Sequence, residues 1–163
     1  MTPAQPFRQR SLLIALAAAF ATATIGGALT RIGPWYYALE KPAFQPPDWL
    51  FGPAWTLIFI LAAVAAHRAW QFATDSGGRR RVLLLFVLNA VLNVGWSYLF
   101  FFRQRPDLAL YESVALWLSV AVLIGVFGRR PTSVTWLLAP YLAWVSFATA
   151  LNAAIVDINP PFA

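Results

Sequence analysis

The sequence has no cysteine and very little charge, and each shortage excludes a class of chemistry or fold. Without cysteine the chain forms no disulfide, thiolate metal site, iron–sulfur cluster or cysteine nucleophile. Charged residues make up only 11% of the chain, against about 25% in soluble domains, so they are too few to cover a soluble surface. The 60% hydrophobic content excludes a disordered chain. Together these features predict a membrane protein.

The apolar residues form five long blocks that are separated by short charged clusters. A helix of about 20 apolar residues crosses the hydrocarbon core of a bilayer, whereas a β-barrel would show short alternating segments. We therefore predict an all-α integral membrane protein, a bundle of five transmembrane helices that forms one domain over residues 1–163. The helices are expected at residues 11–30, 50–70, 82–102, 108–128 and 133–156.

The first block also has features of a secretory signal, because two arginines precede an apolar run that ends in small residues. A retained helix is the favoured interpretation, since the run is longer than the usual signal core of about 7–15 residues. Small side chains also recur at every fourth position along it, which suits close helix packing. They are Ala15, Ala19, Ala23 and Gly27.

The basic residues predict the orientation of the chain. Eight fall on one side of the five predicted helices and four on the other, and the positive-inside rule puts the richer side in the cytoplasm. The amino terminus is therefore expected in the cytoplasm and the carboxyl terminus outside, with the cell (inner) membrane as the expected location. Because the basic residues mark helix ends, with Arg79–Arg81 able to meet anionic lipid heads, no nucleic-acid partner is expected.

The titratable side chains within the predicted helices are few, and none indicates a metal site. His67 is the only histidine and lies near the cytoplasmic end of the second helix, where an interfacial role is favoured over metal or haem ligation. Glu112 lies about one turn inside the fourth helix and is expected to reach the interface. No glycine-rich phosphate loop or internal repeat occurs. No metal and no required cofactor are therefore predicted.

The segment between the first two predicted helices, residues 31–49, is rich in aromatic side chains and proline. Prolines fix the backbone φ angle and aromatic rings carry much apolar area, so this segment is expected to fold back as a lid. The alternative is that its tryptophans and tyrosines form the interfacial belt found at both membrane surfaces. The aromatic residues are Trp35, Tyr36, Tyr37, Phe44 and Trp49, and the prolines are Pro34, Pro42, Pro46 and Pro47.

Amides and aromatic rings share one face on each of two predicted helices. A spacing of three or four residues places the members of each set on one side of a helix. Polar amides at bilayer depth face protein or a cavity, so the two faces predict a pocket for a flat, largely apolar ligand. Hydrogen bonding between helices is the alternative role for the asparagines. The third-helix set is Asn89, Asn93, Trp96 and Phe100, and the fifth-helix set is Tyr141, Trp144, Ala148 and Asn152.

Three motifs cover these same regions in order along the chain. The first is WYYALEKPAFQPPDWLF, from Trp35 to Phe51, followed by Ala54-Trp55-Thr56. The second is NVGWSYLFF, which begins at Asn93, and the third is PYLAWVSFATALN, which begins at Pro140. In that order they resemble the first loop with the second helix, the third helix and the fifth helix of the tryptophan-rich sensory protein and translocator protein family (TspO/MBR).

The resemblance implies a membrane-embedded homodimer that binds porphyrins such as protoporphyrin IX, or another flat apolar molecule, in a pocket closed by the first loop. Some members of the family occur in outer membranes, so an outer membrane is the alternative location. The resemblance also implies the residues that contact the ligand, to which the shared helix face adds Asn89. The predicted ligand-binding residues are Trp35, Trp49, Trp55, Asn89, Asn93, Trp96, Tyr141, Trp144, Ala148 and Asn152.

The sequence departs from the family at several of these places. Asn89 stands where the family usually has glutamine, and Gln45 where asparagine or a similar residue is usual, so hydrogen-bond reach changes by a methylene. Ala43 stands where some relatives carry tryptophan, which leaves the lid or pocket roomier. The proposed cholesterol motif needs a basic residue within five positions after Tyr141, and none is present. No cholesterol function is therefore predicted.

The leading hypothesis is a tetrapyrrole-binding membrane protein that acts as a sensor or regulator, or as a transporter, of porphyrin intermediates. The macrocycle would stack on aromatic rings, and its propionates would pair with Arg31 and Lys41. The alternative is an enzyme, because some bacterial relatives degrade bound protoporphyrin in light, with Trp55 and Trp144 as the candidate catalytic residues. A small transporter is disfavoured because the chain has no inverted repeat and no evident charged relay.

Overall fold

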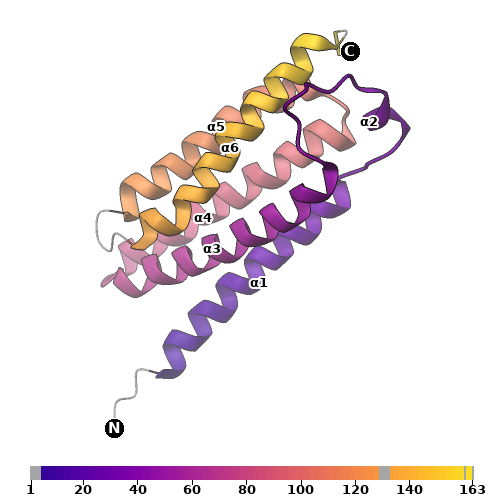
Figure 1. Ribbon diagram of the computed structural model, residues 1–163. Coiled ribbons are helices and arrows are strands. Elements are labelled where there is room, and N and C mark those ends of the chain that lie inside the picture. The colour runs from indigo at the N-terminus through magenta and orange to yellow at the C-terminus, as the bar shows by residue number, and fades with distance from the viewer. Residues whose placement is uncertain (1–4, 129–132, 160, 163) are drawn as a thin grey trace.

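The computed structural model describes residues 5–128, 133–159 and 161–162, with side chains from residue 9 onward. The described residues form helices joined by short loops, and no strand occurs among them. Figure 1 shows the α-helices gathered into one bundle. They are α1 (Gln5–Leu29), α2 (Pro34–Ala38), α3 (Phe51–Phe72), α4 (Ser76–Ser97), α5 (Pro106–Phe127) and α6 (Ser133–Ile158), with a 3-10 turn η1 (Asp48–Leu50) before α3 and a π-helix η2 (Tyr98–Phe102) after α4.

Five helical segments in the described part of the chain are long and apolar enough to cross a membrane. They are α1, α3 with η1, α4 with η2, α5 and α6. The predicted fold class, an all-α bundle of five membrane spans, is confirmed. The short helix α2 lies in the segment between α1 and α3, where proline and aromatic residues are concentrated.

The third span begins earlier than the sequence predicts. Asp75 caps α4, because its Oδ1 accepts the backbone N–H of Gly78 at 2.6 Å. Arg79–Arg81 therefore lie in the first turns of α4 and not in the preceding loop. The predicted start at residue 82 is wrong because a cap, and not the last charged residue, sets the beginning of a helix. The helices α3 and α6 likewise end at Phe72 and Ile158, beyond the predicted residues 70 and 156.

The five spans pack as a closed ring in the order α1, α3, α6, α5, α4 and back to α1. The helices α3 and α4 also touch across the ring. Consecutive spans run in opposite directions, so the start of α1 and the end of α6 lie at opposite ends of the bundle (Figure 1). Residues 31–49, which we call the lid, lie at the end where α6 finishes (Figure 1). We call this end of the bundle the lid end.

The larger apolar core cluster is formed by buried residues of α3, α5 and α6. Lipid tails are as apolar as leucine, so close contact between helices, rather than removal from water, holds such a bundle together. Ala65 of α3 and Ala109 of α5 are completely buried and allow neighbouring backbones to approach closely. In α1, by contrast, Thr22 and Gly26 are the buried positions among the described side chains. The first helix is therefore the most exposed of the five spans.

A chain of hydrogen bonds joins α4, α5 and α6 inside the bundle. Asn93 Nδ2 donates to the Tyr141 hydroxyl at 3.1 Å, and that hydroxyl donates to Asn89 Oδ1 at 3.2 Å. Asn89 Nδ2 donates to Ser119 Oγ at 2.7 Å, and Ser119 Oγ donates to the carbonyl oxygen of Leu116 at 2.7 Å. We call these four side chains the amide network. Both asparagines therefore take the role in helix packing that the sequence left open as an alternative to ligand contact.

His67 takes part in a second polar tie, which lies at the end opposite the lid. Its Nδ1 lies 2.9 Å from Ser11 Oγ, and Gln71 Nε2 donates to the same oxygen at 2.9 Å. The contact joins α1 to α3, two helices that pack against each other along the bundle. His67 therefore has a direct structural role in attaching the first helix.

Candidate ligand-binding pocket beneath the first loop

A cavity of about 550 Å³ lies inside the helix ring, next to the lid. Its wall is formed by α1, α3, α4, η2, α5 and α6 together with lid residues, which include Tyr36, Gln45 and Trp49. Cavities that bind small molecules have volumes of roughly 300–1,000 Å³. The cavity is therefore of the size that encloses a small organic ligand.

The cavity exists because small residues occupy the positions where the ring would otherwise be filled. Ala23, Gly26 and Gly27 of α1 line it, as do Gly52 of α3 and Ala148 of α6. A Cβ atom added at Gly27 or Gly52 would meet no atom within 4 Å. Ala23 and Gly27 belong to the series of small residues in α1 that the sequence suggested for helix packing. These two residues thus also line the pocket.

Aromatic rings form a large part of the remaining wall. Trp55 stacks on Phe59 with ring centres 5.5 Å apart, and its ring meets that of Trp144 edge-on at 6.5 Å. On α4 and η2, Trp96 stacks on Phe100 at 5.0 Å. All five of these residues line the cavity. An apolar pocket walled by flat rings favours a flat, largely apolar ligand, since rings attract each other in stacked and edge-on arrangements.

Three polar atoms of cavity-lining residues are buried without a hydrogen-bond partner among the described residues. They are Trp144 Nε1, Thr149 Oγ1 and Asn152 Oδ1, all on α6. The amide nitrogen of Asn152 does have a partner, because Nδ2 donates to the carbonyl oxygen of Pro106 at 2.9 Å. Buried polar atoms are nearly always hydrogen-bonded, so these three are suited to polar groups of a ligand.

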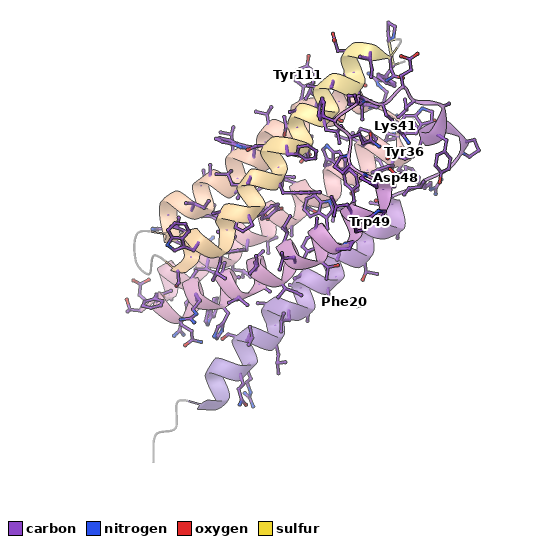
Figure 2. All side chains as sticks on the ribbon, viewed as in Figure 1. Phe20, Tyr36, Lys41, Asp48, Trp49 and Tyr111 are labelled. Carbon is purple, nitrogen blue, oxygen red and sulfur yellow. The ribbon has the colours of Figure 1, made fainter. Side chains whose placement is uncertain are left out.

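The lid is held together by polar contacts around Tyr36, which Figure 2 shows beside the start of α3. The Tyr36 hydroxyl donates to Asp48 Oδ1 at 2.9 Å and accepts from Gln45 Nε2 at 3.2 Å. Burial, and the hydrogen bond to Asp48, raise the pKa of Tyr36 above its ordinary value, so the hydroxyl stays a donor. Lys41 Nζ lies 3.9 Å from the centre of the Tyr36 ring, a cation–π contact.

The structure brings seven of the ten predicted ligand-binding residues onto the cavity wall. Five of them are aromatic or small residues, and Asn93 and Asn152 supply amides. The seven are Trp49, Trp55, Asn93, Trp96, Trp144, Ala148 and Asn152.

The other three predicted residues lie outside the cavity wall. Trp35 packs edge-on against Phe100 with ring centres 6.1 Å apart. Asn89 and Tyr141 belong to the amide network, and the Tyr141 ring supports Trp55 from behind at 6.0 Å. A shared helix face could not separate Asn89 from Asn93, because both face Tyr141 and the depth at which the cavity ends along α4 depends on packing.

The basic residues expected to pair with propionates also lie off the wall. Lys41 lies over Tyr36, and the Arg31 guanidinium lies 4.4 Å from the centre of the Phe102 ring. Sequence reasoning missed the contribution of α1 and of Thr149, although the spacing of small residues in α1 was a usable signal. Among the described residues no three His, Asp or Glu side chains lie together as metal ligands.

Comparison with known proteins agrees with this architecture. The model of the TspO/MBR family matches residues 13–157, which include the lid, the cavity wall and all three motifs. The chain belongs to the TspO/MBR family. The resemblance seen in the motifs is therefore confirmed over nearly the whole chain. As a member of this family with five apolar spans, the protein is an integral, multi-pass membrane protein.

Individual relatives extend over nearly the whole length of the protein. It is 41% identical over 153 residues to the tryptophan-rich protein TspO of Archaeoglobus fulgidus, covering 91% of this chain and 94% of the relative. It is 37% identical over 148 residues to the tryptophan-rich protein TspO of Chlorobaculum tepidum, with 90% and 92% covered. It is 35% identical over 144 residues to a tryptophan-rich sensory protein of Cereibacter sphaeroides, with 88% of each covered.

Proposed function

We propose that this TspO/MBR protein binds a tetrapyrrole of the protoporphyrin IX type within the membrane and acts as a sensor or regulator, or as a transporter, of porphyrin intermediates. The observation that carries the proposal is the composition of the cavity wall. Stacked and edge-on aromatic rings on α3, α4, η2 and α6 suit a flat macrocycle. The unpartnered polar atoms on α6 suit its few polar groups.

Propionate groups are best accommodated toward the lid. Arg31 and Lys41 both belong to the lid, and each now lies over an aromatic ring. A carboxylate forms a stronger, charge-assisted contact with such cations than a ring does, so the propionates would draw these side chains from the rings. The macrocycle would occupy the aromatic cavity below.

Titration of the detergent-solubilised protein with protoporphyrin IX in the dark tests the proposal. Saturable quenching of tryptophan fluorescence with a shifted Soret band is expected, because the rings of Trp55, Trp96 and Trp144 line the cavity. A flexible, non-aromatic fatty acid of similar apolar area is the control and should compete weakly. Quenching that rises linearly without saturation would overturn the tetrapyrrole assignment.

A second candidate function is light-dependent oxidative degradation of the bound porphyrin. Trp55 and Trp144 favour it, since their ring centres lie 6.5 Å apart in an edge-on arrangement and both rings line the cavity where the macrocycle would lie. Illumination of the complex with dioxygen present as the oxidant should then give a product that is absent in the dark. Trp55→Phe and Trp144→Phe variants that still bind should lose it. Equal product formation by both variants would leave binding as the function.

A further inference from the structure

The lid is tied to the bundle by a side chain that follows the last helix. Asn159 lies directly after α6, and its amide makes a two-way contact with the backbone of Glu40 in the middle of the lid. Glu40 N–H donates to Asn159 Oδ1 at 2.9 Å, and Asn159 Nδ2 donates to the carbonyl oxygen of Glu40 at 3.0 Å. The two residues are 119 positions apart in the sequence.

The chemistry of the amide fits this contact well. A carboxamide offers a C=O and an N–H side by side, as a peptide group does, so it pairs with an extended backbone as a neighbouring strand would. The second hydrogen on Asn159 Nδ2 is also used, because Nδ2 donates to the carbonyl oxygen of Ile155 at 2.8 Å. That bond fixes the side chain to the last turn of α6. Asn159 thus holds the lid from the end of α6.

The other hydrogen bonds of lid side chains among the described residues are made within the lid itself. Tyr36, Gln45 and Asp48 hydrogen-bond to one another, and Lys41 lies on the Tyr36 ring. The lid also meets the bundle through aromatic rings, such as Phe44 with Phe147 at 6.3 Å and Arg31 over Phe102 at 4.4 Å. Among the described residues, Asn159 is the one side chain outside the lid that hydrogen-bonds to it. Loss of this contact would free the middle of the lid and leave its inner structure intact.

We propose that Asn159 is a positioning residue that clasps the lid shut over the cavity, so that ligand enters and leaves only when the clasp opens. The ligand part of this inference rests on the function proposed above. A clasp of this kind stabilises the closed lid whether the cavity is filled or empty. Breaking it should therefore speed both entry and release by about tenfold, while the dissociation constant changes little.

Hydrogen exchange at the Glu40 amide tests the clasp without any ligand. Asn159→Ala removes both bonds and should raise the exchange rate of this amide about tenfold. Glu40→Ala is the matched control, because the clasp uses only the backbone of residue 40, and its amide should keep its protection. Circular dichroism verifies that both variants are folded. Equal protection of the residue 40 amide in Asn159→Ala and the unchanged protein would overturn the clasp.

Stopped-flow binding of protoporphyrin IX then tests the effect of the clasp on ligand entry and release. We expect Asn159→Ala to bind and to release the ligand faster, with a nearly constant ratio of the two rate constants and hence a nearly constant dissociation constant. Faster release with unchanged association would show that Asn159 contributes to ligand affinity directly, which would overturn its role as a clasp. If the unchanged protein binds no protoporphyrin, the proposed function fails, and the exchange of the Glu40 amide still decides whether the clasp exists.

Discussion

Trp144 presents both a ring and a polar atom at the cavity. Its ring meets Phe51 at 5.7 Å and Trp55 at 6.5 Å, and its Nε1 is buried without a partner in the part of the chain that the structure describes. A buried donor that makes no hydrogen bond costs roughly 1–3 kcal/mol, so a ligand acceptor placed there gains that energy. The same residue therefore favours binding through ring contact and through a hydrogen bond.

Replacing Trp144 by alanine should weaken porphyrin binding by at least about tenfold, because stacking area and the Nε1 donor are both lost. Titration by tryptophan quenching and the Soret band measures the change, and circular dichroism should show unchanged helix content. Trp136→Ala is the control, since Trp136 lies on the same helix and is 76% exposed on the outer surface. An unchanged affinity in Trp144→Ala would remove this residue from the pocket.

The helix α6 illustrates how one element combines two functions along its length. Val134 and Leu138 pack into an apolar core cluster near its beginning, whereas Ala148 and Asn152, nearer its end, line the cavity. Pro140 lies between the two parts and lacks the N–H that would continue the helical hydrogen bonding. The packing of α6 therefore determines both the stability of the bundle and the shape of the pocket.

Filling the cavity from α6 should block binding without unfolding the protein. Ala148→Leu adds apolar volume on the cavity wall and is expected to lower porphyrin affinity by about tenfold or more. Ala150→Leu makes the same change two positions away on an exposed face and should bind normally. Binding titrations at matched detergent concentration compare the two. Equal affinities would show that the ligand does not reach Ala148.

The amide network links α4, α5 and α6, so its loss should lower the stability of the bundle. Tyr141→Phe leaves Asn93 Nδ2 and Asn89 Oδ1 without the shared hydroxyl and should destabilise the bundle by about 1–2 kcal/mol. Thermal unfolding in detergent should show a lower Tm. Tyr111→Phe is the control, because Tyr111 is 77% exposed and points away from the bundle (Figure 2). A Tm equal to that of the control would mean that the asparagines find other partners.

At the scale of the whole molecule, the bundle has two chemically different ends. One end carries the lid, the clasp and the cavity, and the other carries Arg79–Arg81 and the contact between Ser11 and His67. We propose that the second end faces the cytoplasm, as the distribution of basic residues predicts. Ligand would then reach the cavity from the side opposite to the cytoplasm.

The absence of cysteine allows this orientation to be tested by single-cysteine labelling. Ser76→Cys, at the start of α4, should react with a membrane-impermeant maleimide only when the cytoplasmic face is accessible. Ala43→Cys, exposed in the lid, should react only from the opposite face. The reverse pattern in intact cells would invert the proposed topology. Labelling of both sites from one face would contradict the crossing of the membrane by α3, the single span between them.

The number of spans and the character of the lid follow from local composition. Hydropathy and length add up along the chain, so five apolar blocks predicted five spans without any knowledge of their order in space. Proline and aromatic residues between the first two spans likewise predicted a compact lid, and short motifs predicted the family. Helix ends were less accurate, because a single cap at Asp75 moved the start of α4 into the charged segment.

The identity of the pocket residues required the tertiary structure. Sequence spacing placed Asn89 and Asn93 on one face, where both bond to Tyr141, yet only Asn93 lies on the cavity wall. Asn89 is one turn farther from the lid, and non-local packing fixes the depth at which the cavity ends. The wall supplied by α1 and the clasp from Asn159 to Glu40 depend on segments that meet only when the ring of helices closes. The composition along the chain therefore determined that this protein spans a membrane and carries an aromatic lid. The packing of its helices decided which side chains line the pocket.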